Sequence, residues 1–165
     1  MMTSSFWEFS TRIYARPGVA EALLRLQNEQ GADVNLLLYC AWHAASGRGA
    51  LPQTEIAALD EALDPWREAI IRPLRSLRER IKHEPALGTL PMAGDARDKV
   101  LAAELASEQV AQQLLESLTR KRPAAIADAA GARDTSLQAY FSHLGLPAGT
   151  QQPLLEALQD AFGNN

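Results

Sequence analysis

The sequence has one cysteine, few aromatic residues and no apolar run long enough to cross a membrane. Cys40 is the only cysteine among 165 residues, so no disulfide can form within the chain, which is typical of a reducing compartment. The first residues, Met1 to Glu8, lack the basic start and apolar stretch of a signal peptide. These absences predict a cytoplasmic protein that does not enter a membrane.

Charge is also modest and slightly acidic. Charged residues make up 22% of the chain and the net charge is −4, which argues against nonspecific nucleic-acid binding as the main task. Hydrophobic residues make up 47% of a chain of 18.0 kDa. That content is enough to build one domain with a real core.

No stretch alternates apolar and polar residues as a half-buried strand does, and no repeat is visible. Apolar residues recur at helical spacing instead. The sequence therefore predicts an all-α fold, a single compact bundle of about six to eight helices. Within one domain over 1–165 we expect a core part over about 4–84 and a looser C-terminal helical subregion over about 95–163.

The segment 33–47 is the most apolar of the chain and is expected to form the central helix. Asp33 can accept hydrogen bonds from the first turn, and Gly47 suits the left-handed conformation at a helix end. Apolar residues between them cover nearly the whole helical circumference, which is typical of a buried or membrane helix. About four turns are too few to span a bilayer, so burial is predicted.

Helices are expected on both sides of this segment. Two precede it, over about 5–14 and 17–30, and a tight corner at Gly31 joins the second to Asp33. A short helix is expected to begin at Gln53 or Thr54, and Asp64-Pro65 to start another. That next helix carries a kink or break at Pro73. Its expected buried stripe is Trp66, Ile70, Leu74, Leu77 and Ile81.

The second half is predicted to contain a loop over 85–94 and three further helices. Asp95, Asp134 and Thr150 are their expected first residues. The first of the three runs to about Thr119. Its expected apolar side consists of Val100, Leu101, Ala103, Leu105, Val110, Leu114, Leu115 and Leu118.

Two strings in the first half carry a family resemblance. One is Phe6-Trp7-Glu8-Phe9-Ser10, and the other runs from Asp33 to Trp42 as DVNLLLYCAW. With them, the sequence resembles a family of small proteobacterial proteins defined only as a domain of unknown function. The resemblance implies a bacterial, cytoplasmic, helical protein, and it carries no activity with it.

Polar residues on the central segment are the first candidate for a binding site. Asn35, Tyr39, Trp42 and Ser46 fall on one helical stripe. If this stripe lines a cavity, Asn35, Tyr39 and Trp42 could orient a small ligand, with Trp7 and Trp66 as further aromatic walls. Alternatively, each polar tip finds a backbone partner or reaches the surface, as is usual for buried Asn, Tyr and Trp.

A basic stripe is the second candidate. Arg67, Arg75, Arg78 and Lys82 fall roughly on one helical face, which could dock an acidic protein partner, a phosphate-bearing ligand or RNA. The alternative is a solvated face braced by ion pairs at helical spacing, such as Glu68 with Arg72 and Glu79 with Lys82 or His83.

No residue pattern dictates a chemistry. Cys40 and His43 are only roughly adjacent on one helix and lack an orienting third group. The three histidines show no metal-ligand spacing. We therefore predict no catalytic residue, no metal site and no cofactor.

The sequence leaves two main functional hypotheses. The first is a noncatalytic binding or adaptor module that acts through a protein partner, as a monomer or homodimer. The alternative is a small-molecule-binding protein or enzyme with an aromatic-lined pocket beside the central helix. A pocket requires a cavity at Asn35 and Tyr39, whereas docking requires a filled core and an exposed basic or apolar patch.

Overall fold

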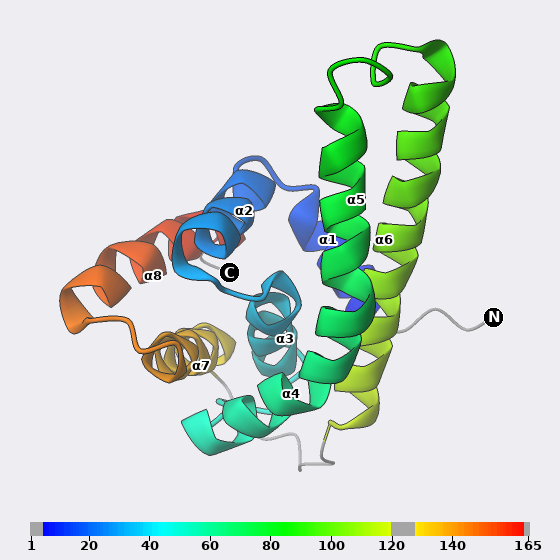
Figure 1. The fold of residues 1–165 in the computed structure, drawn as a ribbon. Helices are drawn as coiled ribbons and strands as arrows, with labels where there is room; N and C mark the ends of the chain where they lie inside the picture. Colours follow the sequence, from blue (N-terminus) through cyan, green and yellow to red (C-terminus); the bar gives the residue numbers. More distant parts are fainter. Residues whose placement is uncertain (1–4, 120–127, 164–165) are drawn as a thin grey trace.

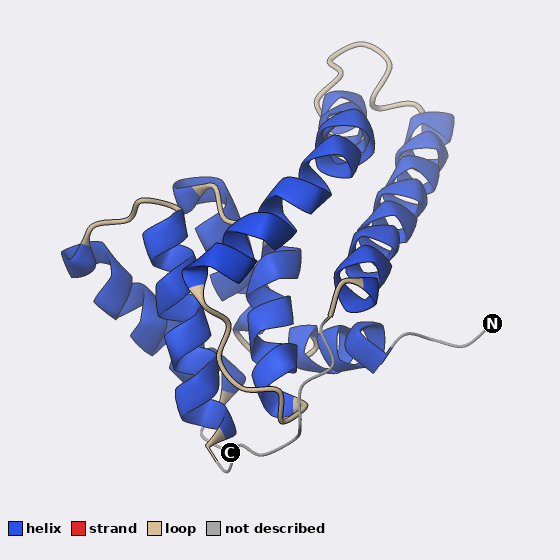
Figure 2. Ribbon diagram, turned by 90° about the horizontal axis from the view of Figure 1, so that it is seen from below, coloured by secondary structure: helices blue, strands red, loops and turns tan. Residues whose placement is uncertain are grey.

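The central helix of the predicted bundle is present and buried on all sides. The computed structural model describes residues 5–119 and 128–163, and every regular element in these ranges is helical (Figures 1 and 2). Helix α3 (Val34–Ala45) is buried from Asn35 through Ala44. The Asp33 side chain accepts a hydrogen bond from the Leu36 amide at 3.2 Å and so caps the helix. The all-α prediction is confirmed.

Five further helices form the body of the molecule with α3; the first four contact α3 directly, and the last packs on two of these four (Figure 1). They are α1 (Ser5–Tyr14), α2 (Val19–Gln30), α4 (Gln53–Trp66), α7 (Ala129–His143) and α8 (Ala148–Phe162). The predicted tight corner is confirmed, because Gly31 ends α2 with a φ of 68° and Asp33 already caps α3. Tyr140 of α7 supports this corner by accepting a hydrogen bond from the Asp33 amide at 2.7 Å.

The predicted start of a helix at Asp64-Pro65 is wrong. Helix α4 continues through Pro65, and a five-residue π turn, η1 (Arg67–Ile71), joins it to α5 (Arg72–Lys82). Asp64 does not cap, because its carboxylate accepts a hydrogen bond from Arg67 at 2.9 Å. The predicted distortion near Pro73 is confirmed, since the wider π bonding pattern lies immediately before this proline.

Helices α5 and α6 (Pro91–Ser117) form a long antiparallel hairpin that projects from the body (Figure 1). Helix α6 begins one turn before the expected Asp95, with Pro91 at its first position, where a missing N–H costs nothing. No helix in the described residues is both long enough and apolar enough to span a membrane.

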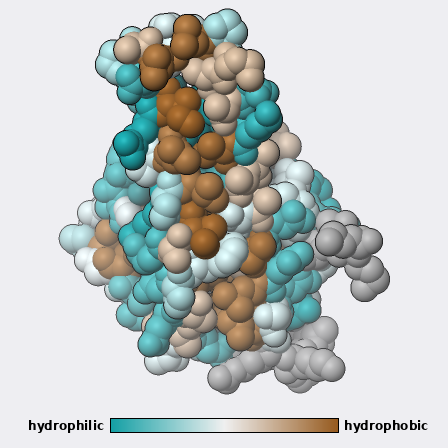
Figure 3. All heavy atoms as spheres, turned by 45° about the vertical axis from the view of Figure 1, so that its right-hand side comes forward, coloured by the Kyte–Doolittle hydropathy of each residue, from teal (hydrophilic) through white to brown (hydrophobic). Residues whose placement is uncertain are grey.

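The predicted apolar side of α6 is largely wrong. Leu101, Leu105 and Val110 are 39%, 53% and 42% exposed, while Glu104 and Gln112 are buried. The reason is the partner helix, because the arginines of α5 draw the acidic side of α6 inward. The apolar side chains left outside contribute to a strip that follows the hairpin (Figure 3).

The C-terminal helices pack directly on the core. Helix α7 begins five residues before the expected Asp134 and is capped by Asp128, whose carboxylate accepts a hydrogen bond from the Gly131 amide at 2.8 Å. Helix α8 begins at Ala148, two residues before the expected Thr150. The sequence predicted a looser subregion here, but Leu137 and Phe141 of α7 are fully buried against the core that surrounds α3.

Candidate functional site

A large groove lies beside the central helix, between α1, α2, α3, α5 and α6. Its volume is about 1010 Å³. Its walls are mainly apolar and include side chains that reach the surface, and these are Trp7, Tyr14, Leu24, Leu101 and Leu105. Its floor is polar. We call this feature the α1–α6 groove.

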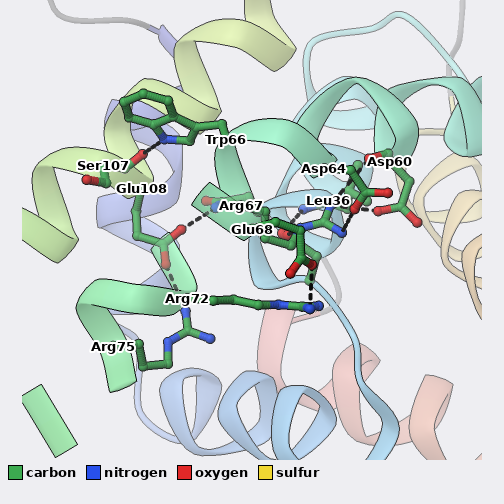
Figure 4. Close-up of polar contacts among 12 residues, drawn as sticks. Leu36, Asp60, Asp64, Trp66, Arg67, Glu68, Arg72, Arg75, Ser107 and Glu108 are labelled. Carbon is green, nitrogen blue, oxygen red and sulfur yellow. Dashed lines mark hydrogen bonds and ion pairs between the residues drawn. The ribbon is translucent and has the colours of Figure 1, made fainter. Parts of the chain in front are cut away.

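The floor of the groove is a chain of hydrogen bonds that begins in the core. The Gln112 amide nitrogen donates to Asn35 Oδ1 at 3.0 Å, and Asn35 Nδ2 donates to Glu108 Oε2 at 2.5 Å. Glu108 Oε1 then accepts from Arg75 Nη2 at 2.9 Å (Figure 4). Helices α3, α5 and α6 are thus joined through polar side chains at the bottom of an apolar groove.

The chain continues to the surface through two arginines of α5. Arg75 Nε and Arg78 Nε donate to the two carboxylate oxygens of Glu104 at 3.2 and 2.6 Å. Arg78 also donates to Glu79 at 2.6 Å. Because Glu104 is only 6% exposed, its burial requires this double pairing. The pairing also explains why α6 turns its acidic face toward α5.

Two polar atoms on the groove lining have no hydrogen-bond partner among the described residues. They are Ser10 Oγ and Gln112 Oε1. Both residues are 3% exposed, and both line the groove. Leaving a buried polar group unsatisfied costs about 1–3 kcal/mol. A water molecule or a ligand atom that reaches these groups would complete their bonding.

Burial and neighbouring charges at the floor of the groove raise the pKa of Glu108. Burial raises the pKa of the Glu108 carboxyl, and the negative charges of Asp33 and Glu104 raise it further, against the opposing effects of Asn35 and Arg75. Burial and the charge of Glu108 likewise raise the pKa of Tyr14 on the groove wall.

The raised pKa of Glu108 predicts how stability changes with pH. Its usual value is near 4.5, so ionisation in the folded protein is harder than in the unfolded chain. The stability that neutral Glu108 contributes is present below pH 4.5, and it is lost as pH rises through the pKa of Glu108 in the folded protein. Glutamine does not ionise, so Glu108→Gln removes this loss. The free energy of unfolding of the variant should therefore increase relative to that of the wild type as pH rises from about 4.5 to 7. Urea unfolding across that range, with the exposed Glu61→Gln as control, measures it, and a pH-independent difference contradicts it.

A second polar cluster centres on Arg67, close to the groove. Its guanidinium lies 2.9 Å from Asp33, 2.7 Å from Asp60 and 2.9 Å from Asp64 (Figure 4). His143 of α7 binds the other oxygen of Asp60 at 2.8 Å. Burial alone would lower the pKa of Arg67, but the three carboxylates outweigh it and raise the pKa. The cluster ties the α2–α3 corner to α4, η1 and α7, so it is structural.

The five predicted ligand-binding residues do not share one wall. Asn35 and Trp7 line the groove. Tyr39 and Trp42 are buried in the core, where both pack on the Phe6 ring with centroid distances of 5.5 and 5.2 Å. Tyr39 bonds Thr119 at 2.7 Å, and Trp66 Nε1 donates to the Ser107 carbonyl at 2.9 Å. Sequence reasoning missed Ser10, Tyr14, Leu105, Glu108 and Gln112.

The four predicted partner-binding residues divide in a similar way. Arg67, Arg75 and Arg78 all bind carboxylates of this chain, and their side chains are only partly exposed. Lys82 is exposed near the end of α5. Of the helical pairs expected as the alternative, Glu68 with Arg72 and Glu79 with His83 are present. The basic stripe therefore mostly holds the hairpin together.

Cys40 and His43 occupy structural positions in the core. Cys40 is fully buried, and burial raises the pKa of its thiol to about 12, far from the range of a reactive thiolate. His43 Nδ1 lies 2.8 Å from the Gly49 carbonyl oxygen. Within 5–119 and 128–163, no three His, Cys, Asp or Glu side chains are grouped as metal ligands.

One comparison identifies relatives of this chain. The family model described as "Protein of unknown function (DUF2390)" matches residues 5–115, whereas no curated protein and no solved structure matches. The matched range contains every residue that lines the groove, from Trp7 to Gln112. It stops before α7 and α8. By this match, which spans most of its length, the chain belongs to the DUF2390 family of proteins of unknown function.

Proposed function

We propose that this protein is a noncatalytic binding module whose ligand is a small amphipathic molecule held in the α1–α6 groove. One observation carries the proposal: an apolar-walled groove of about 1010 Å³ is lined by two residues with buried polar atoms that have no hydrogen-bond partner in the described part of the chain. Ligand sites in proteins have this composition, with apolar walls of about 300–1,000 Å³ and a few polar groups that fix orientation. We place the protein in the bacterial cytoplasm, as a monomer or homodimer.

The noncatalytic part of the proposal rests on the floor chemistry. Glu104 accepts hydrogen bonds from two arginines, and Glu108 from Arg75 and Asn35. Carboxylates held in this way are positioned and neutralised by the arginines that bind them, and among the described residues neither is paired with a nucleophile as covalent catalysis requires. The carboxylate-bound arginines also give no support to RNA binding through the basic stripe.

A neutral apolar dye tests the groove directly. Nile red should bind the wild-type protein with increased fluorescence, and Leu105→Glu should weaken binding at least tenfold, because it places a charge on the apolar wall. Val110→Glu is the matched control, since Val110 is 42% exposed on the same helix but is not a lining residue. Equal binding by both variants, or no binding by the wild type, contradicts the proposal.

A second candidate, docking of a protein partner, is favoured by the tip of the hairpin. Leu87, Leu90 and Met92 are 62%, 53% and 72% exposed there, and large apolar side chains grouped on the surface are typical of interaction sites. An adaptor that acts through this tip should retain its partner in the Leu105→Glu variant and lose it in Met92→Glu. Quantitative affinity capture with the two variants separates the tip from the groove, and retention by Met92→Glu counts against the tip.

A further inference from the structure

Resting on the proposed function, we infer that the α1–α6 groove selects ligands by their head group, taking an apolar molecule whose head donates hydrogen bonds, a hydroxyl or an ammonium, and rejecting a carboxylate. The inference comes from the direction of the hydrogen bonds along the floor. It names the ligand class for the site described above.

The carboxylate of Glu108 fixes the orientation of both amides on the floor. An ionised carboxylate only accepts hydrogen bonds, so Asn35 turns its Nδ2 toward Glu108, at 2.5 Å. Asn35 Oδ1 then faces Gln112 and accepts from its Nε2 at 3.0 Å. Gln112 Oε1 is left without a hydrogen-bond partner within 5–119 and 128–163. This row of hydrogen bonds therefore ends at an acceptor atom, which can bind a ligand group that donates a hydrogen bond.

Ser10 provides the second contact from the opposite helix. Its Oγ, on α1, is also buried and without a partner among the described residues. A hydroxyl can both accept and donate a hydrogen bond. The Ser10 hydroxyl can therefore accept from an ammonium, and it can either accept from or donate to a ligand hydroxyl. Gln112 and Ser10 thus line one groove from α6 and α1. We expect an ammonium head group to donate to both, and a hydroxyl head group to donate to Gln112 and accept from Ser10.

The charges of the groove oppose an anionic head group. Arg75 and Arg78 line it, but each already binds two carboxylates. Against these two arginines the lining contains three carboxylates, those of Glu79, Glu104 and Glu108. Two positive and three negative groups give the groove lining a net charge of −1. A ligand carboxylate in the groove would be repelled by this charge and would also lose its hydration.

Three amphiphiles with the same eight-carbon chain test this selection. In competition with Nile red, 1-octanol and octylammonium should displace the dye at concentrations at least tenfold below that of octanoate, equivalent to about 1.4 kcal/mol. Equal displacement by all three, preference for octanoate, or no displacement by any of them overturns the head-group inference. The proposed function survives each of these results if Nile red binding still depends on Leu105 and not on Val110.

Two variants locate the contacts. Ser10→Ala and Gln112→Met should each weaken 1-octanol about tenfold while Nile red, which the apolar walls hold, changes less than threefold. Gln113→Met, one residue along on the exposed side of α6, is the control and should leave both ligands unchanged.

Ser10→Ala also has a readout that does not depend on ligand. Removing an unsatisfied buried hydroxyl should raise the melting temperature of the free protein by about 2–4 °C. A gain in stability together with a loss of 1-octanol affinity is the expected result. If Ser10→Ala and Gln112→Met both bind 1-octanol like the wild type, the inference is overturned.

Discussion

Replacing Arg67 by methionine is expected to lower the free energy of unfolding by about 3–5 kcal/mol, the range for breaking a buried ion pair by removing one partner. The side chains of Arg67 and Asp33 are 13% and 14% exposed, and that of Asp60 is 22% exposed. Without the guanidinium, the largely buried carboxylates of Asp33 and Asp60 would lose their positive partner, beside the more exposed carboxylate of Asp64. Asp33 also caps α3, so the effect reaches the central helix.

The matched control for this prediction is Arg72→Met, five residues further along. Arg72 pairs with Glu68 on the helix surface, and their side chains are 58% and 55% exposed. An exposed pair of this kind contributes about 0.3–0.5 kcal/mol. Chemical denaturation should therefore separate the two variants by several kcal/mol. Similar losses in both would show that the Arg67 cluster is no more important than a surface pair.

The second large effect is expected at Leu37 in the middle of α3. Its side chain is fully buried, and a helix covered on all sides leaves its neighbours little freedom to collapse into a void. Leu37→Ala should cost about 3 kcal/mol or more, within the range of about 2–5 kcal/mol for such truncations. The melting temperature should fall by about 6 °C or more.

Leu77→Ala provides the comparison, because Leu77 is 43% exposed on α5 and alanine is a good helix former. Its loss should stay below about 1 kcal/mol. Thermal and urea unfolding of the pair measure the difference. A small loss at Leu37 would mean that packing around α3 adapts more readily than its burial implies.

The central helix could be predicted because its signals are local. A capping aspartate, an apolar circumference and a terminal glycine all lie within 33–47, and the structure uses each of them as expected. The same holds for the corner at Gly31. These features depend on residues a few positions apart, where backbone sterics and the helical period decide the outcome.

The acidic side of α6 was not predictable in the same way. Arg75 and Arg78 meet Glu104 across separations of 29 and 26 residues. The spacing of residues within either helix does not indicate that these side chains pair. The apolar residues of α6 therefore predict a buried face, while charge pairing with α5 places several of them outside. The groove depends on this arrangement, which is why only Asn35 and Trp7 among the predicted ligand residues line it.

The π turn η1 determines which side of α5 faces α6 in the hairpin. Within it the Arg72 amide bonds to the Arg67 carbonyl, five residues back, so the turn holds one residue more than an α-helical turn would. Each residue of an α-helix advances about 100° around the axis. If the same residues of η1 followed α-helical bonding, everything after them would be rotated by about that angle, which would carry Arg75 and Arg78 off the face that meets Glu104. A single inserted residue thus sets the rotational register on which the floor of the groove depends.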